Sequence, residues 1–191
     1  MTDLIAHLES FLGLITGGTR GDDSTPSGVQ VAWFAEDVPF AGVTTMATVG
    51  LSRYHLAQST DAGIHHELLM HLPTHGQPAN AAGVLFQVAR MAIARGYGLA
   101  RGEILGPSGT LFEGTPMTAL YAATPGYLPA AFHTCETSAA TIVMTCLVPL
   151  TTSDAIYART HGWRALEQAI AEEQPDLVNL NRPSLRVGTA T

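Results

Sequence analysis

Two segments of the sequence are apolar on both faces, and they constrain the architecture more than any other feature. They run from 117 to 123 and from 141 to 148. Strands with this pattern lie in the middle of a sheet that is covered on both sides, because each face needs apolar neighbours. The chain therefore needs a sheet with helices on its faces, and its 46% of hydrophobic residues can supply a sizeable core.

Further strands are predicted from runs of β-branched and aromatic residues at 29–34, 43–49 and 64–72, with a weaker one at 101–105. Helices are predicted where apolar residues recur with a period of 3.6. The first runs from Leu4 to Ile15 and ends at Gly17-Gly18, and the second lies between Asn80, which can cap it, and Gly96.

Two more helices are predicted towards the end of the chain. Thr151 precedes Asp154 by three residues, which resembles a capping box for a helix that ends at Gly162. A short helix then carries Trp163 and stops before Pro175. With four or five helices, six or seven strands and no internal repeat, we expect an α+β fold: a mixed, largely antiparallel sheet flanked by helices, in a single domain spanning 1–191.

Charge and cysteine content exclude several classes. Nine basic residues face 16 acidic ones, for a net charge of −7, and no basic run is present, which disfavours nucleic acid as a partner. Cys135 and Cys146 are too few for a disulfide framework. The first residues carry an acid, Asp3, where a secretory signal needs positive charge, and no apolar run approaches a membrane span. We therefore expect a cytoplasmic protein without a membrane partner.

Four histidines surround Glu67 and raise the question of a metal site: His65, His66, His71 and His75. Three residues separate Glu67 from His71, whereas a zincin motif needs two. On a strand, His66 and His71 point to opposite faces and cannot share an ion. We expect surface and edge histidines and no metal, with a metal-dependent hydrolase as the alternative.

The sequence Gly50-Leu51-Ser52-Arg53-Tyr54 resembles the nucleophile elbow of a serine hydrolase, but its second glycine is missing. A turn at the end of a strand is the favoured interpretation, and hydrolysis by Ser52 is the alternative. The glycine-rich segments at 17–21 and 106–110 lack the features of a phosphate-binding loop. We therefore expect no catalytic residue and no cofactor.

Five carboxylates in predicted loops are candidates for contact with a protein partner. An acidic surface speeds the encounter with a basic protein, although solvated charge also serves solubility. These residues are Asp22, Asp23, Glu36, Asp37 and Glu113.

The segment from Asp176 to Ser184 alternates apolar residues with Asn and then places Arg182 before a proline. Arginine cannot lose its charge and brings five donors. If Arg182 is buried, it must be paired with carboxylates or backbone carbonyls. We expect this segment to anchor the chain end against the body of the domain.

The order of several motifs resembles the Suppressor of fused family. In chain order they are residues 48–52; residues 67–73; Ala89-Arg90; residues 148–150, followed by Asp154 and Tyr157-Ala158-Arg159; and residues 181–184. Together these motifs cover about residues 44–187. The resemblance assigns structural roles, and no catalytic ones, to the following motif residues: Gly50, Ser52, Glu67, Leu68, Pro73, Pro149, Asn181, Arg182, Pro183 and Ser184.

The resemblance also implies a function. The animal member is a two-domain regulator that binds a transcription factor, and bacterial chains of this length resemble its first domain. Bacterial relatives are regarded as immunity proteins that bind and neutralise a toxin. A non-enzymatic protein-binding domain whose partner is a toxin domain encoded nearby is therefore expected, with a homo-oligomeric scaffold as a further alternative.

Overall fold

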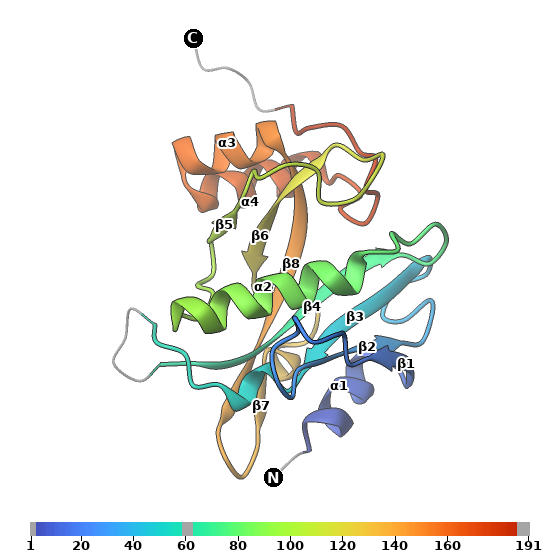
Figure 1. Cartoon of the computed structure of the whole chain (residues 1–191). Helices are drawn as coiled ribbons and strands as arrows, with labels where there is room; N and C mark the ends of the chain where they lie inside the picture. Colours follow the sequence, from blue (N-terminus) through green and yellow to red (C-terminus); the bar gives the residue numbers. More distant parts are fainter. Residues whose placement is uncertain (1–2, 59–62, 187–191) are drawn as a thin grey trace.

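A computed structural model describes residues 3–58 and 63–186, and its centre is the long strand β8 (Thr141–Thr151). β8 runs parallel to β4 (His65–Pro73) on one side. On its other side it pairs antiparallel with β6 (Met117–Ala123) along one half and with β7 (Thr134–Glu136) along the other. Of the two segments predicted to be central, β8 lies inside the sheet between β4 and β6, whereas β6 lies one strand from the edge, between β8 and the short β5 (Figure 1).

The sheet continues outward from both β4 and β6. Beyond β4 follow β3 (Val43–Val49), β2 (Gln30–Phe34) and β1 (Ile15–Thr19), and beyond β6 lies β5 (Ile104–Leu105). The pairing of β4 with β8 is parallel, and the other strand pairs described are antiparallel. The predicted α+β fold with a mixed, largely antiparallel sheet is confirmed.

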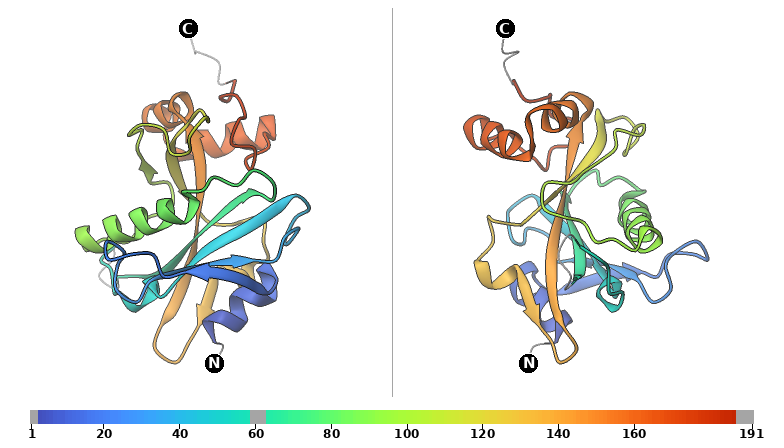
Figure 2. Two further views of the ribbon diagram at one scale, coloured as in Figure 1. Left: turned by 45° about the vertical axis from the view of Figure 1, so that its right-hand side comes forward. Right: turned by 90° about the vertical axis from the view of Figure 1, so that its left-hand side faces the viewer.

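Helices cover the two faces of this sheet unequally (Figure 2). The helix α2 (Ala81–Arg95) packs on one face over Leu68, Met70 and neighbouring apolar residues. On the opposite face, α1 (Leu4–Leu12) packs on one end, around Leu69 and Met144. The pair α3 (Thr152–His161) and α4 (Trp163–Glu173) packs on the other end. No helix in the described ranges is long and apolar enough to cross a membrane.

Several predicted boundaries need correction. The first helix ends at Gly13, whose φ of +83° breaks it, and Ile15 belongs to β1 instead. Gly17 and Gly18 are paired residues of that strand and not a helix stop. Within residues 3–58 and 63–186 the sheet has eight strands rather than six or seven, because β1 and β7 were not predicted. β5 holds only two residues of the expected strand at 101–105.

Helix starts agree better with the sequence. α2 follows Asn80, but the Asn80 side chain donates to the Leu111 carbonyl at 2.8 Å instead of capping the helix. At α3, the predicted capping box is confirmed, because the Thr151 side chain accepts from Asp154 N and the Asp154 side chain accepts from Thr151 N.

The parallel strands β4 and β8 stay paired only as far as Leu69 and Cys146 and then diverge (Figure 1). Beyond that point β4 is paired only with β3, while β8 is paired only with β6. Pro149 lies on the diverging part of β8 and has no N–H to donate to a neighbouring strand. We call the space between the diverging ends the wedge, and the segment 177–185 closes it, with Leu180 buried in the α2-side core.

Candidate functional site

Five hydrogen bonds converge on the carboxylate of Glu67, a fully buried side chain of β4. Its donors are the Thr48 hydroxyl at 2.6 Å, the N–H groups of Gly50, Leu51 and Ser52 at 2.8–3.2 Å, and the Ser52 hydroxyl at 2.7 Å. Burial raises the pKa of Glu67, and the hydrogen bonds from Thr48 and Ser52 oppose that rise. All five groups donate, so the cradle suits an ionised carboxylate that ties β4 to the end of β3.

Gly50 makes this cradle possible. Its φ is +106°, and a Cβ built there would lie 2.2 Å from the carbonyl oxygen of Gly28. The turn after it directs three successive N–H groups at one carboxylate. Ser52, the nucleophile of the hydrolase alternative, donates its hydroxyl proton to Glu67 at 2.7 Å, and Nδ1 of His65 contacts the Ser52 carbonyl oxygen at 2.7 Å. His65 therefore contacts the backbone of Ser52 and not its hydroxyl, unlike the base of a Ser–His pair.

The histidines around Glu67 do not form a cluster. His66 contacts Thr145 on the face covered by α2, while Nδ1 of His71 lies 2.7 Å from the Thr45 hydroxyl on the opposite face, as the strand period predicts. The expectation of surface histidines is wrong for His66, which is fully buried. Burial lowers the pKa of both rings to about 4.

Metal ligation has no geometric basis in the part of the chain that the structure describes. No group of three or more His, Cys, Asp or Glu side chains gathers there. His55 and His65 stack with ring centroids 5.0 Å apart, but each has other contacts. His75 lies elsewhere, beside the loop that contains Glu113. The residues of the metal-dependent alternative are thus spread over both faces of the sheet and its loops.

Arg182 forms a buried ion pair that closes the wedge. Its Nη1 lies 2.9 Å from Asp154 Oδ2, and the two side chains are 3% and 0% exposed. The guanidinium also donates to the carbonyls of Pro149 and Pro183, at 3.3 and 3.0 Å. Asp154 accepts from Leu185 N at 2.8 Å, which fastens the chain beyond the arginine as well. These contacts are internal, so the side chain is held away from any partner.

The other motif residues also lie inside or beside these two networks. Leu68 is fully buried, and Pro73 ends β4. The Ser184 hydroxyl lies 2.9 Å from that of Thr151, and Asn181 N donates to the Asn179 side chain at 2.9 Å. Leu68, Pro149 and Arg182 are buried, whereas Asn181 and Pro183 are exposed.

The five candidate acids are all exposed, but the structure does not gather them into one patch. Asp22 and Asp23 lie in the loop between β1 and β2, and Glu36 and Asp37 lie in the connection from β2 to β3. Glu113 lies in the loop before β6. Asp22 and Asp37 also brace their own loops: Asp22 accepts from Ser24, which lowers the pKa of Asp22, and Asp37 accepts from Gly42 N at 2.6 Å.

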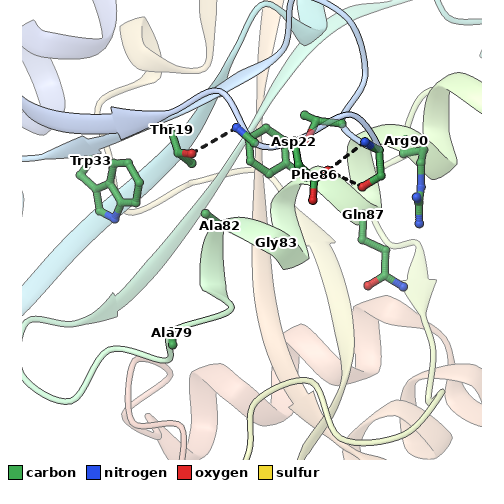
Figure 3. A pocket seen from close by; sticks show the side chains of 12 residues that line it. Thr19, Asp22, Trp33, Ala79, Ala82, Gly83, Phe86, Gln87 and Arg90 are labelled. Atoms are coloured by element: carbon green, nitrogen blue, oxygen red, sulfur yellow. Dashed lines mark hydrogen bonds between the residues drawn. The ribbon is translucent and has the colours of Figure 1, made fainter.

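The loop that carries Asp22 faces helix α2 across an open recess of about 550 Å³, which we call the α2 groove. Phe86, Gln87 and Arg90 lie along the helix on the side that faces the loop (Figure 3). Trp33 of β2 adds a partly buried ring to the lining. The lining residues are small here: Ala82 and Gly83 lie in the first turn of the helix, and Ala79 lies just before the helix.

Charges of both signs border the α2 groove. Arg90 is exposed and forms no ion pair within the described ranges, and Gln87 is exposed beside it. Asp22 lies across the recess on the loop. Sequence reasoning found Asp22 as a loop acid and Arg90 as part of a motif, but missed Trp33 and Phe86. Their strand and helix periods predict core positions, and only the packing shows them at the floor of a recess.

Comparison with known proteins relates this fold to solved structures. The chain resembles a Suppressor of fused homolog from Neisseria gonorrhoeae, with a TM-score of 0.73, 16% identity, and coverage of 94% of this chain and 92% of that one. It resembles a chain of the Sufu–Fu complex with a TM-score of 0.69, 16% identity, and coverage of 96% and 88%.

A third similar structure is Drosophila Suppressor of Fused, with a TM-score of 0.63 and 18% identity. The match covers 86% of this chain but only 44% of the Drosophila chain, so this chain corresponds to less than half of that protein. By sequence, no curated protein matches. A family model described as Suppressor of fused protein matches residues 25–183, most of the chain. The chain therefore belongs to the Suppressor of fused family.

Proposed function

We propose that this chain is a non-enzymatic protein-binding domain that recognises its partner at the α2 groove. The observation that carries the proposal is the contrast between buried and exposed charge. Glu67 is held by five hydrogen bonds and Arg182 is paired with Asp154 inside the domain, whereas Arg90 is exposed, forms no ion pair within the described residues, and lies beside an open recess. An exposed arginine next to a partly buried tryptophan, here Trp33, is typical of the residues that dominate protein interfaces.

The comparisons support this class of function. One structure with the same fold is solved in a complex, the Sufu–Fu complex. The scaffold is held by internal networks, so its loops are free to vary with the partner, as binding loops on rigid scaffolds do. The α2 groove lies between such a loop and a helix.

Within this class, we propose that the partner is a bacterial toxin domain encoded nearby, which the chain neutralises by binding it. The similar chain from Neisseria gonorrhoeae, a bacterium, is covered over 92% of its length, which is in keeping with a bacterial partner. A net charge of −7 favours a basic partner and speeds the encounter with it. We place the complex in the cytoplasm, in keeping with two free and buried cysteines.

The test is direct binding to the product of the neighbouring gene, followed by rescue of cells that express it. A tight one-to-one complex should bury about 800 Å² on each partner. Arg90→Ala should weaken it by about 1–2 kcal/mol if the groove is the interface. Arg186→Ala is the matched control, because Arg186 is also exposed but does not line the groove.

Two outcomes separate the parts of the proposal. Binding without rescue would contradict the neutralising role and leave protein binding intact. Binding that is unaffected by both arginine substitutions would place the interface outside the α2 groove. The mass of the chain in solution, with and without the partner, distinguishes a heteromeric complex from a homo-oligomeric scaffold.

A further inference from the structure

On the sheet face opposite α2, a small apolar recess lies between the area covered by α1 and the area covered by α3 and α4. Its cavity volume is about 200 Å³. It opens where β4 and β8 diverge, so strand residues form its floor and loop residues form its walls. We call it the aromatic pocket, and its principal lining residues are Phe40, His71, Tyr127, Cys146, Val148 and Val178.

Three aromatic rings from distant parts of the sequence meet at this pocket. The ring centroids of Phe40 and Tyr127 lie 5.6 Å apart, and each lies within 6.3 Å of the His71 ring. Phe40 and Tyr127 remain 43% and 48% exposed. The Tyr127 hydroxyl donates to Cys146 Sγ at 3.2 Å, which fixes its ring at the rim. Adjoining exposed rings of this kind mark contact surfaces more often than isolated apolar residues do.

His71 adds a polar group that the domain itself does not satisfy. Its Nδ1 is engaged by the Thr45 hydroxyl, and its Nε2 is buried without a hydrogen-bond partner in the described ranges. A buried polar atom without a partner is unfavourable, and such atoms are uncommon in folded proteins. A bound chain that shifts the flanking rings and offers a backbone group to Nε2 would relieve this deficit.

The aromatic pocket continues into a larger acidic recess. Phe40 and Val178 line both, and the larger recess has a volume of about 780 Å³. Glu113 and Asp176 border it from two loops, and no arginine is among its lining residues. Asp176 uses Oδ1 to accept from the N–H groups of Val178 and Asn179, while Glu113 is exposed and forms no ion pair in the described part of the chain.

We propose that this surface binds a protein segment that inserts one apolar side chain into the aromatic pocket and lays a neighbouring arginine or lysine along Glu113 and Asp176. The volume suits one ring, because a cavity of about 150 Å³ accommodates benzene. The carboxylates select the basic neighbour. The inference rests on the proposed function, because it takes the bound molecule to be a protein. The surface that it concerns is separate from the α2 groove.

The probe is the synthetic peptide acetyl-Arg-Gly-Phe-Gly-Arg-amide, followed by NMR of the labelled full chain. We expect shifts at residues 40, 71, 127, 146–148 and 177–178, with saturation in the millimolar range. Replacing the phenylalanine of the peptide by alanine should weaken binding at least about tenfold, because the buried ring is lost. Replacing both arginines of the peptide by glutamate should abolish binding.

Variants of the chain give the matching test. Tyr127→Ala removes one wall of the pocket, and Val178→Phe fills it, so each should abolish the peptide-induced shifts. Tyr97→Ala is the matched control, because Tyr97 is 51% exposed and lies outside the pocket. Glu113→Gln should weaken binding about two- to fivefold, as expected for an exposed ion pair, and Asp23→Asn should leave it unchanged.

The outcomes distinguish this inference from the proposed function. Peptide binding that Tyr127→Ala abolishes supports the pocket even if the product of the neighbouring gene does not bind. Absence of shifts at the pocket residues, or equal binding of the arginine and glutamate peptides, overturns the inference. A partner that depends on Arg90 but is indifferent to Tyr127→Ala and Val178→Phe would leave the α2 groove as the interface and overturn the second surface.

Discussion

Replacing Arg182 by alanine should destabilise the domain strongly. The substitution removes an ion pair of 2.9 Å between side chains that are 3% and 0% exposed. It also leaves the carbonyls of Pro149 and Pro183 without the guanidinium donor. Breaking a buried pair by removing one partner lowers the free energy of unfolding by about 3–5 kcal/mol, because the remaining charge is uncompensated. For a chain of this size, we expect a fall in Tm of roughly 10 °C.

Urea unfolding at neutral pH measures this loss. Arg101→Ala is the control, since the Arg101 and Glu167 side chains are 52% and 32% exposed and their ion pair should contribute at most about 1 kcal/mol. The double variant Asp154→Leu/Arg182→Met should lose less stability than the two single alanine variants combined, because it leaves no unpaired charge. If Arg182→Ala loses no more than Arg101→Ala, the pair does not hold the wedge closed and the reasoning is wrong.

Further perturbations test the other buried groups. Burial lowers the pKa of His66 and His71 from 6.5 to about 4. Between these two pH values the unfolded chain binds more protons than the folded chain, so the free energy of unfolding should fall as the pH drops from 6.5 to about 4. The expected loss is about 3 kcal/mol per histidine. In urea unfolding at a series of pH values, His71→Phe should halve this loss of unfolding free energy. A free energy of unfolding that does not change with pH would contradict the burial argument. Glu67→Gln should destabilise by roughly 2–4 kcal/mol in thermal melts, because an amide N–H₂ meets N–H and O–H donors. Gly50→Ala should lose about 3 kcal/mol or more, whereas Gly114→Ala, with open space around its Cβ position, should lose about 1 kcal/mol.

Elements with a strong local signal were predictable from the sequence. β3 and β6 have the predicted bounds, and the reciprocal hydrogen bonds of Thr151 and Asp154 start α3 as expected. β1 was missed because Ile15 extends the apolar stripe of the first helix and Gly17-Gly18 resembles a helix stop. Its strand conformation comes from pairing with β2, which local periodicity does not reveal.

The candidate sites were predictable only in their residue types. Asp22 and Glu113 were correctly placed in exposed loops, but they border different recesses, and their sequence context says nothing about this. Phe40, His71 and Tyr127 meet across three separate parts of the chain, so no short-range pattern reports the aromatic pocket. The burial of His66 depends on the neighbouring strand β8, which begins 75 residues later in the chain.

The closure of the wedge by residues 177–185 has a consequence for synthesis on the ribosome. The centre of the sheet cannot form until β8 has been translated, because β4 has no parallel neighbour before then. Even after β8 has emerged, Asp154 cannot form its ion pair until Arg182, which is encoded 28 codons later, has been translated. A nascent chain that stalls in this interval exposes the separated ends of two strands, so chaperone capture should be strongest there and should end when Leu185 leaves the exit tunnel.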